Sequence, residues 1–157
     1  MELRGDFLKV VLQKVSQAKV TTENIENEIE QGFLLLVGVG QTSNYKDAEA
    51  IARKIAKTRI FEDSDGKMNL DIHQVNGEIL SISQFTIYAS VKKGNRPGFT
   101  DAMSPDEANK IYQYFNEQLK SHGVNVKTGE FGAHMDVSLI NDGPITIIFE
   151  SKDGIIQ

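Results

Sequence analysis

The sequence predicts one α/β domain in which two helices are layered on a curved, mainly antiparallel sheet or open barrel. First, the chain has 157 residues with no low-complexity linker or internal repeat, which suits a single domain. Second, about seven short runs are rich in the β-branched and aromatic residues typical of strands. Third, only two runs have a helical period. Because helices do not alternate regularly with strands, a doubly wound parallel fold is not expected.

The first strands are predicted from apolar patterning. Residues 8–15 largely alternate between apolar and polar side chains, as in a half-buried strand. Residues 18–32 form a predicted hairpin whose turn lies near Glu23 and Asn24. The run 32–40 is continuously apolar, which is typical of a central strand.

Two segments have the apolar spacing of amphipathic helices. The first is 45–61, and three residues before it are candidate N-caps: Thr42, Ser43 and Asn44. The second is 104–121, where Ser104 is the expected N-cap, Pro105 takes the first helical position and Glu107 completes a capping box. Their apolar stripes are predicted to be buried: Ala48, Ile51, Ala52, Ile55 and Ala56 in the first, and Ala108, Ile111, Tyr112, Phe115 and Leu119 in the second.

The run 77–90, "GEILSISQFTIYAS", is predicted to be another long strand. In a strand, Gln84 and Thr86 share a face, and polar groups beside aromatic residues need hydrogen-bond partners. One interpretation is a functional site; the other is that Thr86 is simply a good strand former and Gln84 bonds a neighbouring strand. The motif alone does not identify an enzyme.

The C-terminal part is predicted to contain strands at 125–132, 135–140 and 145–150. Between the last two lies "NDGPIT", whose Asn, Asp, Gly and Pro are turn residues, so a hairpin is the local interpretation. Pro144 is unusual there, because it removes a backbone donor at the start of the next strand.

Composition excludes several classes of function. There is no cysteine, so disulfides and thiol nucleophiles are excluded, and the three histidines show no ligand spacing, so neither a metal nor another cofactor is predicted. No apolar run is long enough to cross a membrane, and the expected location is the cytoplasm. The net charge of −5 argues against broad nucleic-acid binding. One local basic cluster, Lys92, Lys93 and Arg96, is either a solvated loop or an anion contact.

Several blocks, taken in order, resemble the D-aminoacyl-tRNA deacylase (D-tyrosyl-tRNA(Tyr) deacylase) family. The most specific are Ser83-Gln84-Phe85-Thr86 and Asn141-x-Gly143-Pro144-x-Thr146; the others are "LKVVLQKV", "GFLLLVGVG", "RIFEDSDGKMN" and "KKGNRPGFTDA". The resemblance extends from about Leu8 to Glu150. It implies a three-layer α/β/β domain over 8–157, with residues 1–7 as an extension expected to be flexible. An upstream start codon assigned in error is one hypothesis for those extra residues.

The resemblance also implies an activity: a cytoplasmic homodimer that hydrolyses D-aminoacyl-tRNA without a metal or other cofactor. Gly143 and Pro144 are then expected to be joined by a cis peptide bond, to enter the partner subunit's active site and to exclude L-amino acids. Glycyl-tRNA, which has no side chain to exclude, is expected to be hydrolysed as well.

The same resemblance implies roles for the first motif. Backbone N–H groups of Phe85 and Thr86 are the expected oxyanion donors, and Thr86 is either the nucleophile or, as we favour, a residue that positions the substrate. Ser83, Gln84 and Phe85 are expected to bind the terminal adenosine.

Lys92, Lys93 and Arg96 become expected tRNA phosphate contacts in that family, although Asn95 stands where family members often carry another basic residue. Two alternatives remain: a non-catalytic module that binds the tRNA 3′ end, and an unrelated small-molecule esterase.

Overall fold

The computed structural model describes residues 7–157. The elements in chain order are β1 (Leu8–Thr21), β2 (Glu26–Ile29), β3 (Gly32–Val39), α1 (Tyr45–Lys57), β4 (Phe61–Glu62), β5 (Met68–Leu70), β6 (Glu78–Ser83), the 3₁₀ helix η2 (Phe85–Tyr88), α2 (Pro105–Ser121), β7 (Asn125–Thr128), β8 (Asp136–Lys152) and β9 (Ile155–Ile156). None of the helices in this part of the chain is long and apolar enough to cross a membrane. Of the predicted N-terminal extension, residues 1–6 lie outside the described residues. The Phe7 carbonyl accepts hydrogen bonds from the Ser43 and Tyr88 hydroxyls.

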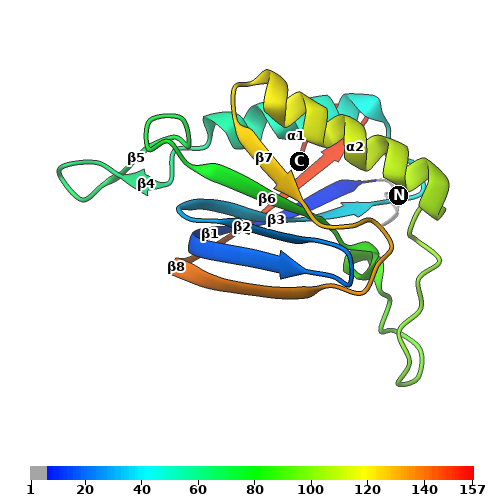
Figure 1. Cartoon of the computed structure of the whole chain (residues 1–157). Coiled ribbons are helices and arrows are strands. Elements are labelled where there is room, and N and C mark those ends of the chain that lie inside the picture. The colour runs from blue at the N-terminus through cyan, green and yellow to red at the C-terminus, as the bar shows by residue number, and fades with distance from the viewer. Residues whose placement is uncertain (1–6) are drawn as a thin grey trace.

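One large curled sheet runs through the molecule in the order β7-β6-β3-β1-β8-β9, with β2 paired to β1 (Figure 1). Strand β1 is antiparallel to β3 and β8, whereas β3–β6 and β6–β7 are parallel. The sheet is therefore mixed, and the prediction of two helices on a curved, single-domain sheet is confirmed. Parallel neighbours need crossover connections, and the two helices supply them: α1 lies between β3 and β6, and α2 between β6 and β7.

Both helices cover one face of the sheet (Figure 1). Every residue of the two predicted apolar stripes is buried. All of them except Ala56 pack with the sheet in the larger of two apolar clusters, where Phe33 of β3 stacks on Phe61 with ring centroids 5.2 Å apart. This face stabilises the fold, since full burial of a large apolar side chain contributes about 1.5–3 kcal/mol.

The two helix N-termini are capped differently. Asn44 caps α1: its side chain accepts from the Asp47 N–H while Asp47 accepts from the Asn44 N–H. Ser104 and Pro105 begin α2 as predicted, but the Ser104 side chain makes no capping bond. The predicted capping box at Glu107 is wrong, because Glu107 instead pairs with Lys110 one turn along, 3.2 Å away.

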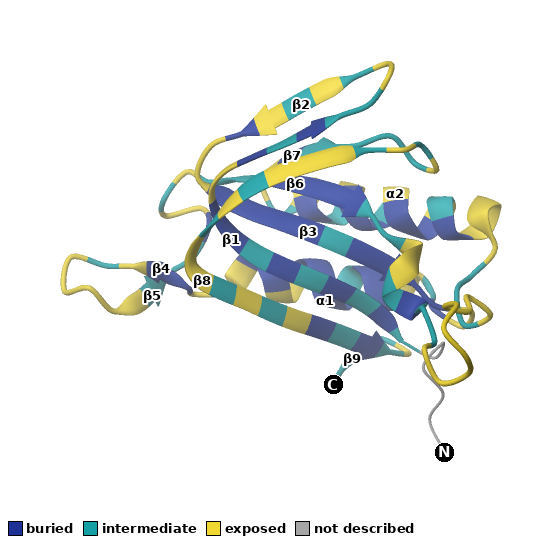
Figure 2. Cartoon of the chain, turned by 90° about the horizontal axis from the view of Figure 1, so that it is seen from below, coloured by how far each residue is buried: buried dark blue, intermediate teal, exposed yellow. Residues whose placement is uncertain are grey.

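The opposite face of the sheet curls into a half-barrel lined by a smaller apolar cluster: Val15, Ala18, Val20, Ile29, Leu34, Leu80 and Ile82. Side chains rather than backbone bonds connect its margins, β2 and β7. The Asn27 amide donates to the Thr128 carbonyl (2.6 Å), and the Lys127 ammonium donates to the Glu28 carbonyl (2.7 Å). In Figure 2 most residues of β2 and β8 are coloured as exposed or intermediate.

Candidate active site

A groove of about 700 Å³ opens where β6 ends. Its lining is largely apolar and comes from five parts of the chain: Val37 and Val39; Ile82, Ser83, Gln84 and Phe85; Phe99, Ala102, Met103, Ser104, Pro105 and Ala108; Phe131, Gly132, Ala133, His134 and Met135; and Val137. Three of the predicted site residues, Ser83, Gln84 and Phe85, therefore line the same groove.

The chain does not continue as a strand through the first motif. The Gln84 N–H donates to the Val37 carbonyl (2.8 Å), and residues 85–88 then form η2, so the predicted strand over 77–90 is wrong beyond Ser83. Two features favour the turn. It buries the Tyr88 ring completely, and it packs on Gly38, where an added Cβ would lie only 3.0 Å from Ile87. Tertiary packing thus overrides the strand propensity of this segment.

The turn exposes the groups expected to do the chemistry. The Phe85 ring is 59% exposed and contacts Phe99 edge-to-face, with centroids 5.0 Å apart. The first hydrogen bond of the turn runs from the Ile87 N–H to the Gln84 carbonyl. The N–H groups of Phe85 and Thr86 therefore have no acceptor inside the turn.

The Thr86 hydroxyl has an amide, not a base, as its neighbour. The Gln84 side-chain amide bonds the Thr86 Oγ1. An amide cannot remove a proton from a hydroxyl, whichever way it is oriented. Within residues 7–157, no group of three or more His, Asp or Glu side chains could hold a metal ion.

The basic cluster lies on a hairpin-like loop between η2 and α2. Ser90 and Gly98 exchange two backbone bonds of 2.7 and 2.9 Å at its base. The cationic residues Lys92, Lys93 and Arg96 are exposed beyond it. The loop returns through Phe99 into the groove, so basic tip and groove belong to one connected surface.

The second motif lies in a bulge of β8, not in a turn between two strands. Strand β8 is continuous over Asp136–Lys152, so the predicted hairpin at 141–146 is wrong. Val15 pairs with Asn141 and Gln13 with Thr146, so one β1 residue faces four β8 residues, 142–145. Those four residues bulge from the ladder.

Side chains hold this bulge in shape. Asn141 spans it: its Oδ1 accepts from the Ile145 N–H (2.8 Å), and its amide donates to the Thr146 hydroxyl (3.1 Å). These bonds replace missing ladder partners, which explains why "NDGPIT" remains in a strand. The Gly143–Pro144 peptide bond is cis, as the resemblance implied, and both residues are exposed.

A buried lysine lies beneath the bulge. The Lys14 side chain is 9% exposed, its ammonium is 3.4 Å from the Asp142 carboxylate, and it lies over the Phe61 ring, 5.4 Å from the centroid. Lys14 therefore connects the residue before Gly143 to the helix-covered core.

The two motifs lie apart within one chain. Thr146, Gln13, Leu34 and Leu80 occupy one row across β8, β1, β3 and β6. That row is three strand spacings wide, or about 14 Å, and Ser83 is three residues, or about 10 Å, further along β6 than Leu80. Neither Gly143 nor Pro144 lines the groove.

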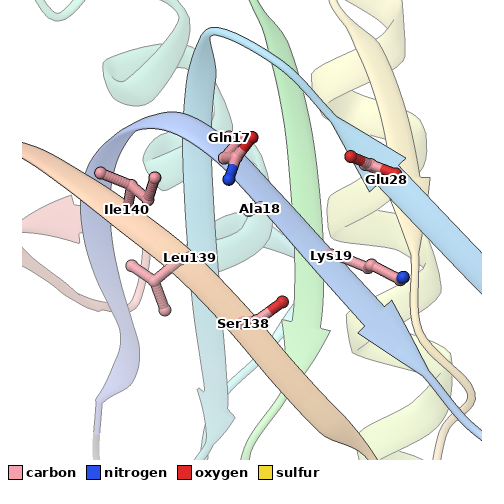
Figure 3. Close-up of a pocket in the computed structure, with 7 residues that line it drawn as sticks. All are labelled: Gln17, Ala18, Lys19, Glu28, Ser138, Leu139 and Ile140. Carbon is pink, nitrogen blue, oxygen red and sulfur yellow. The ribbon is translucent and has the colours of Figure 1, made fainter.

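Two smaller hollows contain no predicted site residue. One, of about 270 Å³, lies between β1, β2 and β8 (Figure 3), lined by Gln17, Ala18, Lys19, Glu28, Ser138, Leu139 and Ile140. The other, of about 360 Å³, involves loop residues around Ile72 and Gly123.

Sequence reasoning missed several groove residues. Phe99 follows the basic loop directly, and that aromatic residue beside basic ones was the available signal. Phe131 and Met135 carried no local signal, because only the tertiary fold brings the 131–135 segment beside the end of β6.

Comparison with known proteins identifies the family of this chain. The family model described as D-Tyr-tRNA(Tyr) deacylase matches residues 11–150. A Staphylococcus aureus (strain JH9) protein named D-aminoacyl-tRNA deacylase is 59% identical over 150 residues, covering 96% of this chain and all of that protein. The chain belongs to the D-Tyr-tRNA(Tyr) deacylase family.

Solved structures give the same fold. A protein described as the c-Myc DNA Unwinding Element Binding Protein is 39% identical, with a TM-score of 0.83 over 91% of this chain and 98% of its own. A probable eukaryotic D-amino acid tRNA deacylase has a TM-score of 0.81 over 92% of this chain and 100% of its own. Its identity of 16% shows the fold alone. The prediction of an enzyme of the D-Tyr-tRNA(Tyr) deacylase family is thus confirmed.

Proposed function

We propose that this protein hydrolyses the ester that joins a D-amino acid to the 3′ end of tRNA. The observation that carries the proposal is the end of β6, where Phe85 presents an exposed ring beside an apolar groove and the backbone N–H groups of Phe85 and Thr86 have no acceptor inside the turn. An exposed aromatic ring suits the unstacked base of a single-stranded RNA end. Ser83 and Gln84 then contact the terminal adenosine.

The reaction needs little from side chains, because an aminoacyl ester is already activated. Water adds to the ester carbonyl, and the N–H groups of Phe85 and Thr86 donate to the oxyanion that develops. The carbon–oxygen bond to ribose then breaks, and the ribose oxygen takes a proton, releasing the amino acid and tRNA. The adjacent ribose hydroxyl orients the water. Thr86 positions the substrate, consistent with the amide beside its hydroxyl.

Chirality is selected by exclusion, with Gly143 and Pro144 of a second copy reaching into the groove. The separation of the two motifs within one chain supports a homodimer. So does β8, on which Ile140 and Ile148 are exposed near the edge of the sheet. Apolar residues in such a position favour association. Exclusion requires few contacts with the amino acid, so many D-residues are accepted, and glycine is not excluded.

The tRNA backbone contacts the loop that carries Lys92, Lys93 and Arg96, and the protein works in the cytoplasm. A local cluster is sufficient because only the end of the tRNA is bound. DNA binding, which the name of one structural relative describes, has less support, because the net charge of −5 gives no broad basic surface.

A chiral assay tests the proposal. Purified protein is incubated with D-tyrosyl-tRNA, L-tyrosyl-tRNA and glycyl-tRNA, and loss of each ester is followed over time. We expect fast loss of the D-ester, partial loss of the glycyl ester and protection or spontaneous decay of the L-ester. Equal protection of all three esters identifies a non-catalytic binder, and hydrolysis of simple esters without tRNA identifies a general esterase.

A second assay concerns the role of Thr86. A Thr86→Ala variant is expected to lose about tenfold in kcat/KM, because positioning alone is removed; loss of a true nucleophile costs on the order of 10⁶-fold. A loss of that larger size would assign Thr86 as the nucleophile and overturn the substrate-assisted mechanism.

A further inference from the structure

The segment 131–135 forms one wall of the groove, although no regular element supports it. It connects β7, which ends at Thr128, to β8, which begins at Asp136. Since it has no strand partner, its distance from Phe85 depends on its own side-chain contacts and on those of the residues next to it. Those contacts therefore determine the width of the groove.

Glu130 makes the contacts at the start of this wall. Its carboxylate accepts from the Thr22 hydroxyl (2.8 Å) and from the Asn24 side-chain amide (3.0 Å), both in the β1–β2 turn. These bonds hold the pKa of Glu130 below its usual value. The carboxylate has two neutral donors from a segment more than 100 residues away in sequence.

The turn that supplies these donors is itself ordered. The Thr22 hydroxyl oxygen accepts from the N–H groups of Asn24 and Ile25, each at 3.1 Å. The hydroxyl hydrogen is then directed to Glu130. We call the hydrogen bonds from Thr22 and Asn24 to the Glu130 carboxylate the Glu130 clamp. Because both donors are pre-positioned, the clamp needs little reorganisation to form.

The wall turns immediately after Glu130. The Ala133 N–H donates to the Glu130 carbonyl (3.1 Å), and the Phe131 ring packs on Tyr112 of α2, with centroids 5.9 Å apart. Glu130 is thus the point where the wall is attached to the half-barrel, and Phe131 is where it is attached to the helical layer.

We propose that Glu130 is a positioning residue for aminoacyl-tRNA, which holds the 131–135 wall at the distance from Phe85 that the substrate end requires. This inference rests on the proposed deacylase function. Glu130 does not line the groove and acts through the wall. Loosening the wall weakens substrate binding in the ground and transition states alike, so KM changes and kcat does not.

Two variants and one matched control test this role in the full-length protein with D-tyrosyl-tRNA. Glu130→Ala is expected to raise KM about three- to tenfold, the range of one or two ordinary hydrogen bonds, with kcat near that of the wild type. Glu130→Gln keeps one acceptor oxygen and is expected to show a smaller rise. Glu23→Gln makes the same charge change as Glu130→Gln, at an exposed residue of the β1–β2 turn that donates to Glu130, and should leave both constants unchanged.

Amide hydrogen exchange without substrate examines the clamp separately from activity. Faster exchange over 131–135 in Glu130→Ala, and not in Glu23→Gln, is expected. Unchanged exchange there overturns the clamp, and faster exchange with unchanged KM overturns the positioning role. A fall in kcat with unchanged KM also contradicts it. The wild-type protein tests the proposed function independently of the variants. If it is inactive on D-tyrosyl-tRNA, the proposed function itself is wrong.

Discussion

The two motifs of the candidate site differ in what holds them: one is supported by the interior of the sheet, and the other protrudes from an exposed strand. Residues 83–86 lie at the end of β6, a strand with neighbours on both sides, and are backed by the fully buried Tyr88. Gly143 and Pro144 instead protrude from β8, held by the Asn141 side chain and by the ion pair beneath Asp142.

This difference supports the proposal that each site is built from two copies of the chain. The β6 segment builds a groove within its own chain, whereas the β8 segment presents an exposed edge that contacts no groove of that chain. A protruding, pre-shaped bulge is suited to insertion into another molecule. In the proposed homodimer, a second copy of this chain offers the matching groove, and a two-fold arrangement gives each groove one bulge.

The largest expected effect comes from breaking the association of two copies. Ile148 is 59% exposed on β8, so Ile148→Lys places a charge on the proposed interface without disturbing the core. We expect a monomer by light scattering and a loss of about hundredfold in deacylation, the scale of a misplaced catalytic group. Met68→Lys is the matched control, since Met68 is 60% exposed on the separate β4–β5 hairpin. A fully active monomeric Ile148→Lys protein would show that one chain contains a complete site.

Mixing two defective variants tests directly whether the two motifs of one site come from different subunits. Phe85→Ala removes the exposed ring of the groove. Gly143→Ala distorts the bulge, because at a φ of +152° the new Cβ would lie 2.7 Å from the Ile145 nitrogen. Each alone should be nearly inactive. After random exchange of subunits, about a quarter of wild-type activity should return, because half of the dimers contain one intact site of two.

The control for this mixture is Phe85→Ala combined with a Phe85→Ala/Gly143→Ala double variant, in which no site is intact. Activity of the first mixture no higher than that of the control would mean that both motifs serve a site within one chain.

A smaller effect is expected from loosening the bulge. Lys14→Met keeps an unbranched chain against Phe61 but removes the ion pair to Asp142. We expect kcat/KM for D-tyrosyl-tRNA to fall about tenfold, less than for full misplacement. Lys14→Arg retains the pair and should stay near wild type. If Lys14→Met and Lys14→Arg have equal activity, the ion pair has no part in holding the bulge.

Local patterns were sufficient to predict the helical layer. Both helical stripes and the apolar run of β3 were predicted correctly, because a regular period records which face is buried. The parallel pairing of β3 with β6 was not predicted, since a strand carries no local mark of its distant partner. Turn residues were misleading in β8 for a different reason: the Asn141 side chain supplies the missing bonds locally, so the segment stays within the strand.

The candidate site was predictable only in part. Ser83, Gln84 and Phe85 came from the family resemblance, and the structure brings them to one groove. Their backbone could not be predicted, because burial of Tyr88 overrides the strand propensity of its neighbours. The place of Phe99 in the groove lining and the clamp at Glu130 both depend on how separate segments of the chain come together in the fold.

The smallest predicted effect is on how the stability of the protein depends on acid pH, through Glu130. Bonds from Thr22 and Asn24 hold the pKa of Glu130 below its ordinary value of 4.5. A depressed folded-state pKa adds stability that is fully present above pH 4.5 and is lost as the pH falls through the lowered value. In urea unfolding below pH 4.5, Glu130→Gln should therefore show a shallower loss of midpoint with acidification than the wild type, while Glu23→Gln follows the wild type. Parallel curves for wild type and Glu130→Gln would mean that the carboxylate charge is not what fixes the wall.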